Sequence, residues 1–482
     1  MERFTLPTDT ARALPVSTRR SIFEEYADLL IDLDRPGEAL EVAERSRARA
    51  FLDALQDARV DVRTTLSDAE RAEEERLTRA VASARRSAKD LPPALDALES
   101  FYVDLRRSNP AYAALRRPEP ATVDRIRREL VDDRTAFVEY LLGEKRSIAW
   151  VVTRLGVQAA VLPRRSDLEA LASGERAMLA APRSALTGAS DAAPAQAREQ
   201  ELYRRLVAPL SPALRGVTRL IVVADGSLAY LPFEVFRRTA SEFLVEQYAV
   251  TYAQSASASL TLLASGGRDR APRALMALGD SLPDTTAPQP GAAALPSLPG
   301  SRDEIVRISA LFRPGDRVVA LGAEATETTV KQADLARFRY LHFAVHGIVD
   351  DEVPARSGLV LSRDPAGRED GVLRVGEISR LHLDADVVTL SACRTGVGKL
   401  LAGEGLMSLS RAFFYAGARH VVATLWDVAD ESTAQVMVDF YAKMQQGLEP
   451  DEALRQAKIK MLKGVSAVWR HPHFWAPFVA LQ

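Results

Sequence analysis

Residues 339–347 read Arg-Tyr-Leu-His-Phe-Ala-Val-His-Gly, and residues 387–396 read Val-Val-Thr-Leu-Ser-Ala-Cys-Arg-Thr-Gly. Each stretch begins with a short apolar run and ends at turn-forming residues, which is typical of a strand buried on both faces of a parallel sheet. The first predicted strand ends at His346, and the second, over residues 385–392, ends at Cys393. We therefore expect two buried strands that each finish at a reactive side chain.

The spacing of His346 and Cys393 is compatible with a catalytic pair. Cys393 is the only cysteine among 482 residues and lies 47 positions after His346, which leaves room for a crossover between parallel strands. In open α/β sheets, functional groups gather outside the carboxyl ends of the strands. A lone cysteine is most often a small buried hydrophobic residue, but the strand-end position, the matching histidine and the following Gly347 favour a nucleophile.

The predicted reaction begins with the thiolate, because a free thiol with a pKa of about 8.5 is mostly protonated at neutral pH. His346 would remove the proton of Cys393, or lower its pKa as an imidazolium, and would then protonate the departing amine. The backbone N–H groups of Gly347 and Cys393 are the candidate donors to the oxyanion. A donor of this kind typically contributes about 3 kcal/mol to the stability of the transition state.

Two further side chains are candidates for supporting roles. His342 precedes His346 by four positions, so both would lie on the same face of a regular strand. His342 either supports the pair or is a core histidine that is hydrogen-bonded to the backbone. Arg394 either fixes the cysteine loop or pairs with a carboxylate, and the sequence leaves both alternatives open.

The composition is that of an ordinary globular protein, with 47% apolar and 27% charged residues. The net charge of −2 gives no general attraction to nucleic acid or to anionic membranes. No apolar run reaches the length of a membrane span, and the first residues lack a signal segment, so a cytoplasmic location is expected. A single cysteine permits no internal disulfide, which favours a reducing compartment.

The pattern along the chain predicts an α/β protein in three parts. Residues 1–130 read as helices, with one hairpin at 18–57 that resembles a tetratricopeptide repeat. Within this part, residues 66–130 predict one or two long helices interrupted near Pro92-Pro93. Residues 131–272 open with three short strands that form a meander, and residues 243–252 read as a later strand. Residues 273–482 alternate strands with helices. This alternation predicts a mainly parallel sheet flanked by helices.

Several motifs occur in the order found in the CHAT family, whose members are caspase-like cysteine proteases, often joined to tetratricopeptide repeats and related to separases. The chain is similar to that family over about residues 130–482. The segments that carry the resemblance are Asp225-Gly226 through Phe233, Leu295 to Glu304, His342 to Gly347, Ser391 to Gly396, Gly403 to Ala418, Thr424 to Asp430, and His471 to Phe478.

The resemblance implies a caspase-like fold and a peptidase with His346 and Cys393 as its dyad, acting on a protein substrate. It also implies relatives in bacterial defence, some of which cut gasdermin-like pore formers. Separases pair an inactive caspase-like unit with an active one, so residues 131–272 are expected to be a degenerate first half. No cofactor is expected, and the helical N-terminus is expected to bind a regulatory protein.

Substrate preference is expected to come from loops near the dyad. Trp426, Asp427 and Asp430 follow the next predicted strand, and an acidic pocket there would favour a basic residue before the scissile bond. Asp430 also suits the cap of the following helix, and Trp426 also suits the core. Ser391 stands where caspase-fold enzymes specific for arginine or lysine can carry aspartate, so a small apolar residue is an equally open preference.

Rival functions belong to other classes. One is a catalytically silent scaffold for protein interactions, which the intact dyad argues against. Another is a nucleotide-driven switch, but Leu400 stands where the phosphate loop beginning near Gly396 requires a serine or threonine. His471 and His473 could bind a metal as a pair, but no cysteine or acidic cluster accompanies them, so no metal site is expected.

Overall fold

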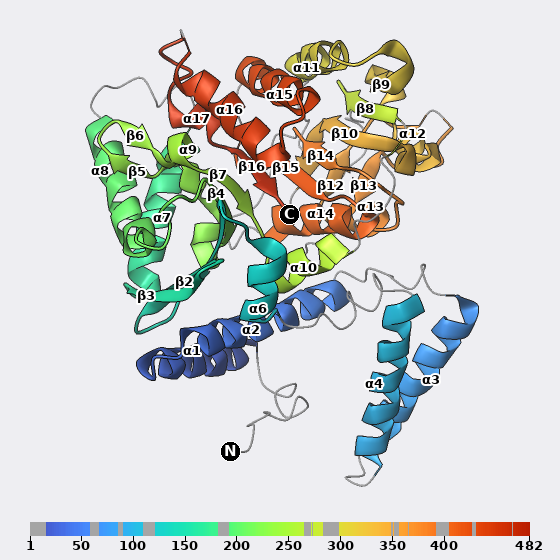
Figure 1. Ribbon diagram of the computed structural model, residues 1–482. Coiled ribbons are helices and arrows are strands. Elements are labelled where there is room, and N and C mark those ends of the chain that lie inside the picture. Colours follow the sequence, from blue (N-terminus) through green and yellow to red (C-terminus); the bar gives the residue numbers. More distant parts are fainter. Residues whose placement is uncertain are drawn as a thin grey trace. The chain divides into compact units, whose positions relative to one another are not determined.

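The structure is a computed structural model (Figure 1), and its chain divides into two compact units. Unit 1 comprises residues 1–51 and 120–260, and unit 2 comprises residues 52–119 and 261–482. The structure describes residues 16–57, 67–84, 90–108, 121–181, 192–264, 271, 273–282, 298–348, 350, 356–364, 366–391, 404–426, 430–464 and 466–482.

Five strands of unit 1 lie side by side in one sheet, in the order β3-β2-β1-β4-β7. β1, β2 and β3 form an antiparallel meander, whereas β4 and β7 continue the sheet in parallel. The three short strands of the meander were predicted from the sequence, and this prediction is confirmed. The bounds are β1 Thr135–Leu141, β2 Ser147–Thr153, β3 Gly156–Leu162, β4 Arg219–Val223 and β7 Ala249–Tyr252, with the helices α6 Val123–Arg125, α7 Arg165–Leu179, α8 Ala192–Leu202, α9 Leu244–Gln247 and α10 Ala256–Ala264.

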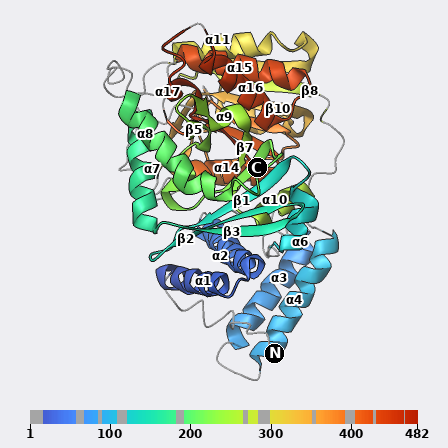
Figure 2. The same cartoon turned by 60° about the vertical axis from the view of Figure 1, so that its left-hand side comes forward.

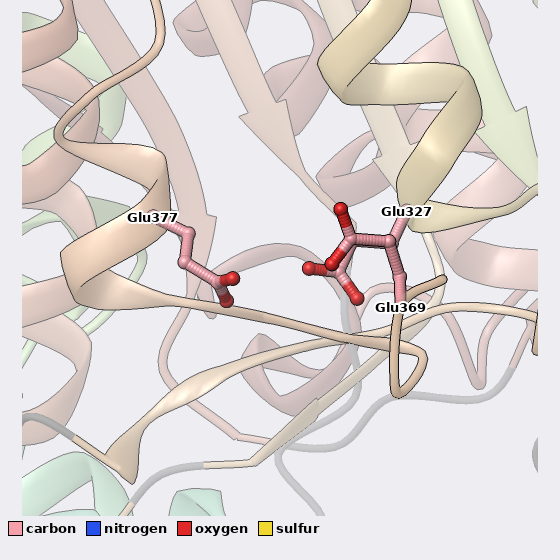
Figure 3. A group of neighbouring side chains, drawn as sticks. All are labelled: Glu327, Glu369 and Glu377. Atoms are coloured by element: carbon pink, nitrogen blue, oxygen red, sulfur yellow. The ribbon is translucent and has the colours of Figure 1, made fainter. Parts of the chain in front are cut away.

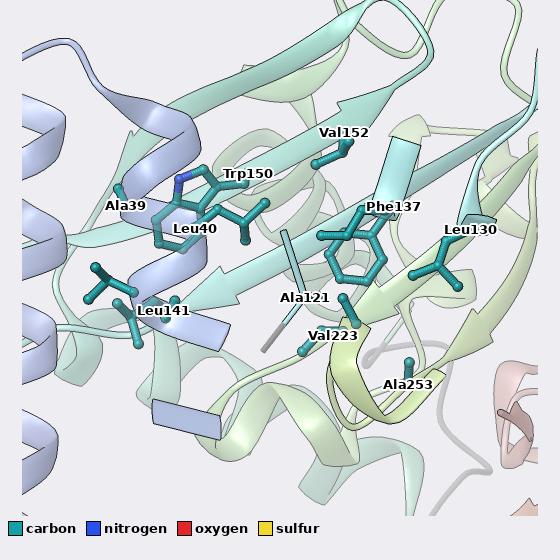
Figure 4. Close-up of a cluster of buried hydrophobic side chains, with 14 of the residues drawn as sticks. Ala39, Leu40, Ala121, Leu130, Phe137, Leu141, Trp150, Val152, Val223 and Ala253 are labelled. Atoms are coloured by element: carbon teal, nitrogen blue, oxygen red, sulfur yellow. The ribbon is translucent and has the colours of Figure 1, made fainter. Parts of the chain in front are cut away.

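The N-terminal helical hairpin, α1 (Val16–Asp32) and α2 (Pro36–Asp57), is part of the core of unit 1. A single helical repeat cannot bury its own apolar face. Here that face packs on the meander, where Leu40 of α2 joins the buried Phe137 and Trp150 (Figure 4). Both ribbon views place α1 and α2 beside β1, β2 and β3 (Figures 1 and 2).

Buried polar groups add specificity to this packing. The carboxylate of Glu44 in α2 accepts hydrogen bonds from the backbone N–H groups of Ala256 and Ser257, at 2.8 and 2.9 Å, at the start of α10. Arg47 donates to the buried Glu139 of β1 at 2.9 Å. Burial and the nearby Glu44 carboxylate raise the pKa of Glu139 well above its usual range, although Arg47 opposes the shift.

Residues 66–130 were predicted to form long helices interrupted near Pro92-Pro93. The structure has α3 at Asp68–Ala84 and α4 at Leu91–Ser108. The two prolines lie in the first turn of α4, where their missing N–H groups are not needed for helix hydrogen bonds, so they begin a helix. Leu77 and Val81 of α3 pack against Tyr102 and Leu105 of α4, which gives the pair a small apolar core.

Unit 2 contains six sheet strands in the order β16-β15-β14-β10-β8-β9. Neighbouring strands in this order are parallel, except that β16 is antiparallel to β15. The predicted fold class, α/β with a mainly parallel sheet flanked by helices, is confirmed. The bounds are β8 Arg273–Gly279, β9 Arg317–Leu321, β10 Phe338–Ala344, β14 Val387–Leu390, β15 His420–Thr424 and β16 Phe478–Leu481.

Helices cover both faces of this sheet. α11 (Pro299–Ser309), α15 (Asp430–Gln445) and α16 (Pro450–Leu462) lie on one face, and α14 (Glu404–Ala416) lies on the other (Figure 1). Successive residues of β10 alternate between the two faces, as expected for a strand. The ring of His342 contacts Tyr441 of α15, whereas the ring of Phe343 contacts Phe413 of α14.

After the carboxyl end of β10, the chain forms a second sheet, which has three antiparallel strands. It consists of β11 (His346–Ile348), β12 (Gly358–Val360) and β13 (Val372–Arg374), and is followed by the short helix α13 (Val375–Ile378). The prediction that the parallel strand ends at His346 is therefore wrong, because this strand stops at Ala344. After Val345 the chain changes partner, and His346 pairs with Val360.

A second difference lies at residues 243–252, which were predicted to be one strand. The structure has β6 (Glu242–Phe243), the four-residue helix α9 and then β7. The side chain of Glu246 accepts a hydrogen bond from the backbone N–H of Phe243 at 3.1 Å. This bond caps the N-terminus of α9, because it gives the backbone N–H of Phe243 an acceptor within the same turn. A continuous strand would not make this bond, so the cap favours a helical turn here.

Candidate functional site

The two strands that lead towards His346 and Cys393, β10 and β14, are neighbours in the sheet of unit 2. β10 pairs in parallel with β14, and Tyr340, His342 and Phe343 lie opposite Val387, Thr389 and Leu390. Both strands are buried, so their apolar side chains explain why they lie in the middle of the sheet. The chain therefore leaves both strands at the same edge.

The register of this pairing relates the two predicted catalytic residues. Every paired residue of β14 is 47 positions after its partner in β10, as Thr389 is after His342. The separation of His346 and Cys393 is also 47 positions. Cys393 itself lies outside the described residues, as does Arg394.

His346 lies two residues beyond β10 as the first residue of β11, and its side chain is only 1% exposed. The next residue, Gly347, pairs with Leu359 of β12. Antiparallel pairing with β12 fixes the backbone of both residues. The predicted oxyanion donor at Gly347 and the catalytic role of His346 stay predictions.

His342 is buried in a network of side chains. Its Nδ1 atom lies 3.3 Å from the hydroxyl oxygen of Tyr441, and its Nε2 atom lies 3.0 Å from a carboxylate oxygen of Glu304 in α11. The hydroxyl of Tyr441 also lies 2.9 Å from Oγ1 of Thr389 in β14. The partners of the His342 ring are thus side chains, not the backbone.

Glu304, Thr389 and Tyr441 had no predicted role. Glu304 stood at the end of a matching motif, and Tyr441 stood in a helix with apolar neighbours. The signal that could have found Tyr441 is its hydroxyl, because a buried tyrosine usually needs a hydrogen-bond partner. Burial raises the pKa of Tyr441, so its hydroxyl stays protonated and can donate.

The predicted pocket residues have different surroundings. The side chain of Trp426 is 4% exposed, and its Nε1–H donates to the backbone oxygen of His473 at 3.0 Å. Ser391 follows β14, and its Oγ is buried without a hydrogen-bond partner among the described residues. Asp430 begins α15, and Asp427 lies outside the described residues. The pocket assignments stay predictions.

One acidic group in the described part of the chain has the spacing of metal ligands. Glu327, Glu369 and Glu377 each offer a carboxylate oxygen, and these oxygens lie within 4.8 Å of one another (Figure 3). The ammonium group of Lys331 lies 2.6, 2.9 and 2.8 Å from these three carboxylates. The three carboxylates raise the pKa of Lys331 although burial opposes them, so the lysine stays charged.

Lys331 therefore acts as the internal counter-ion of this cluster. Glu327 and Lys331 belong to α12 (Glu327–Gln332), and Glu377 belongs to α13. Glu327 also accepts a hydrogen bond from the backbone N–H of Gly371, at 3.2 Å. The cluster ties two helices to the loop before β13, and so braces the small sheet that contains His346.

None of the described helices is both long and apolar enough to cross a membrane.

Comparison with protein families gives a match over the C-terminal part of the chain. The family described as the CHAT domain matches residues 196–482, which is more than half of the chain. The tetratricopeptide repeat protein 28 of Mus musculus is 25% identical over 342 residues, and that of Homo sapiens is 25% identical over 337 residues. Each alignment covers 58% of this chain but only 13% of the relative's length.

Comparison with solved structures gives distant similarities. The Saccharomyces cerevisiae separase in its complex with securin matches with a TM-score of 0.46 and 10% identity, over 97% of this chain and 37% of the separase chain. The Arg-specific cysteine proteinase gingipain R matches with a TM-score of 0.37 and 8% identity, over 66% of this chain and 74% of the proteinase.

Proposed function

The chain belongs to the CHAT domain family, and we propose that it is a cysteine endopeptidase with Cys393 as nucleophile and His346 as general acid and base. The substrate is a protein, and no cofactor takes part. This proposal rests on the neighbouring ends of β10 and β14 in unit 2 and on the chemistry of an imidazole and a thiol. The whole length of the relatives extends far beyond the aligned region, so their substrates and partners do not decide the substrate here.

The observation that carries the proposal is the shared offset of 47 residues. In a parallel pair, residues in register lie side by side across the sheet. His346 and Cys393 have the same separation as the register partners of β10 and β14. The last paired residues, Phe343 and Leu390, are register partners, so the chain leaves β10 and β14 at the same edge of the sheet, and this supports a contact between the imidazole of His346 and the thiol of Cys393.

The proposed reaction has two covalent steps. The thiolate of Cys393 attacks the scissile carbonyl carbon and forms a carbon–sulfur bond, and the carbon–nitrogen bond then breaks as His346 gives a proton to the leaving amine. A water molecule, whose proton passes to His346, then attacks the thioester. This step releases the carboxylic acid and restores the thiol.

The burial of His346 implies a requirement for activation. A reacting carbonyl must come within roughly 3–3.5 Å of the nucleophile, yet His346 is 1% exposed. Segments that cover this side chain must move before a peptide can enter. We therefore expect low basal activity, which rises when a partner or the substrate itself opens the site.

The substrate class follows from the family resemblance. A gasdermin-like pore former or another defence effector is the first candidate. Residues 131–272, which contain no cysteine and no histidine, are proposed as a degenerate caspase-like half. A regulatory protein at the helical N-terminus is the proposed source of the opening signal.

Two measurements test the proposal. The first is cleavage of co-expressed candidate substrates, and of a library of natural peptides, by the wild type, by Cys393→Ala and by His346→Ala, read by mass spectrometry. Both variants should lose at least about 100-fold in rate, since general acid–base catalysis alone contributes about 10²–10⁴-fold. His382→Ala is the matched control, because His382 is an exposed histidine of the same unit.

The second measurement is the rate of alkylation of Cys393 by iodoacetamide as a function of pH. A thiol paired with an imidazolium stays reactive below its ordinary pKa of about 8.5, and His346→Ala should remove this reactivity. Equal cleavage by the wild type and Cys393→Ala, or an ordinary thiol titration that His346→Ala leaves unchanged, would reject the peptidase and favour the silent scaffold.

A further inference from the structure

The hydroxyl group of Tyr441 joins the two strands that lead to the proposed dyad. It lies 3.3 Å from Nδ1 of His342 in β10 and 2.9 Å from Oγ1 of Thr389 in β14. His342 and Thr389 are register partners. Glu304 of α11 completes the network, 3.0 Å from the other ring nitrogen of His342. All four residues are at most 3% exposed.

The position of this network relative to the dyad is specific. His342 precedes His346 by four residues, and Thr389 precedes Cys393 by four residues. Tyr441 therefore bridges the two strands at the same distance along the chain before each proposed catalytic residue. We propose that Glu304, His342, Thr389 and Tyr441, called here the strand clamp, are positioning residues that hold the two strand ends level; the inference rests on the proposed function.

The clamp discriminates between registers. Thr389 is the only residue of β14 with a polar side chain. A slip of two residues keeps the same faces buried, but one such slip would put Val387 in the place of Thr389. The hydroxyl of Tyr441 would then lose its partner in β14, and a buried polar group without a partner costs about 1–3 kcal/mol. Apolar side chains alone would not oppose a slip of two residues in this way, because they need no hydrogen-bond partner.

A small displacement at this level is enough to affect catalysis. One residue of a strand spans about 3.3 Å, whereas a misplacement of about 1 Å can cost about 100-fold in rate. The clamp lies on the face covered by α11 and α15 and is closed to solvent, so no substrate touches it. Its members therefore act through the strands.

The test uses the full-length chain and alkylation of its single cysteine by iodoacetamide between pH 5 and 10. Tyr441→Phe removes only the hydroxyl and keeps the ring contacts with Tyr340 and Phe312. Thr389→Val removes the hydroxyl from the other strand and keeps the shape. We expect each variant to lower the alkylation rate at pH 7 about tenfold and to move the titration towards that of an ordinary thiol. Thr389→Ser keeps the hydroxyl and should retain the wild-type profile.

Tyr140→Phe is the matched control. Tyr140 is a buried tyrosine of unit 1 whose hydroxyl donates to the backbone oxygen of Leu206 at 3.0 Å. Its loss should lower the melting temperature by an amount similar to that of Tyr441→Phe, with no change in thiol reactivity. If Tyr441→Phe fails to fold, Thr389→Val and Thr389→Ser carry the test.

The outcomes separate the clamp from the peptidase. If His346→Ala changes the wild-type thiol profile but Tyr441→Phe and Thr389→Val lower only the melting temperature, the clamp is structural and the inference is overturned while the peptidase stands. If the wild-type thiol titrates normally and His346→Ala changes nothing, the dyad is refuted and the clamp inference is refuted with it.

Discussion

Glu175 of α7 is a buried carboxyl group whose ionisation opposes folding. Its side chain is 1% exposed and lies 3.4 Å from Arg198. Burial and the nearby carboxylate of Glu199 raise the pKa of Glu175 to about 7, and Arg198 only partly offsets the shift. The folded chain thus holds a proton that the unfolded chain releases near its ordinary pKa of 4.5.

We predict a pH-dependent gain in stability for Glu175→Gln. The folded state of the wild type binds more protons, so the contribution of Glu175 is fully present below pH 4.5 and is lost as the pH rises towards 7. Glutamine has no such dependence. Relative to the wild type, Glu175→Gln should therefore gain about 2 kcal/mol in the free energy of unfolding between pH 5 and pH 8.

Urea unfolding at pH 5, 6, 7 and 8 measures this difference. Glu201→Gln is the control, because the pKa of the half-buried Glu201 is lowered to about 2 by hydrogen bonds from Arg204 and Arg205, against the effect of desolvation. Its substitution should not produce the same rise. A difference between Glu175→Gln and the wild type that stays constant from pH 5 to pH 8 would contradict the prediction.

At the scale of the elements, α1 shows how two adjacent residues can differ in their effect. Leu30 is 2% exposed and belongs to the core with α2 and the meander, whereas Leu29 is 53% exposed. Leu30→Ala should lower the free energy of unfolding by about 2–5 kcal/mol because it leaves a cavity. Leu29→Ala should change it by less than about 0.5 kcal/mol.

Thermal and urea unfolding of the two leucine variants check this prediction. The pair is well matched, since both changes replace leucine by alanine within one turn of the same helix. Equal losses would mean that α1 buries a different face from the one observed. A loss below about 1 kcal/mol for Leu30→Ala would show that the hairpin contributes little to unit 1.

Much of the strand order at the candidate site could be predicted from the sequence. The apolar runs of β10 and β14 are local signals, and strand–helix alternation requires parallel neighbours. The end of β10 could not be predicted in the same way. His346 directly follows the apolar residues 343–345, and nothing local marks a strand end before it. His346 belongs to another sheet because it pairs with Val360 of β12, which lies farther along the chain.

The strand clamp was beyond sequence reasoning for a related reason. Glu304, His342 and Tyr441 come from elements far apart in the chain, and no spacing rule connects them. Each residue by itself suits a common role in a helix or a strand. Their contacts form only after α11 and α15 have packed on the same face of the sheet.

At the scale of the whole molecule, the helical N-terminus is not an independent module. α1 and α2 supply Leu30, Ala39 and Leu40 to the core that also contains Phe137 and Trp150. Outside this core, ion pairs connect α1 to two other elements of unit 1: Asp28 pairs with Arg146, just before β2, and Glu24 pairs with Arg165, at the start of α7. A chain without the hairpin would expose one face of its meander.

We predict that deletion of residues 1–57 prevents unit 1 from folding. A large buried apolar side chain contributes about 1.5–3 kcal/mol, so exposing Phe137, Trp150 and Val152 could remove about 4–9 kcal/mol. That loss is comparable with the entire stability of a typical protein, about 5–15 kcal/mol. Soluble yield and limited proteolysis measure the effect.

Replacing residues 67–108 by a flexible linker is the control, because the described buried side chains of α3 and α4 form a separate apolar core. A soluble, protease-resistant product from the 1–57 deletion would show that the meander is stable without the hairpin.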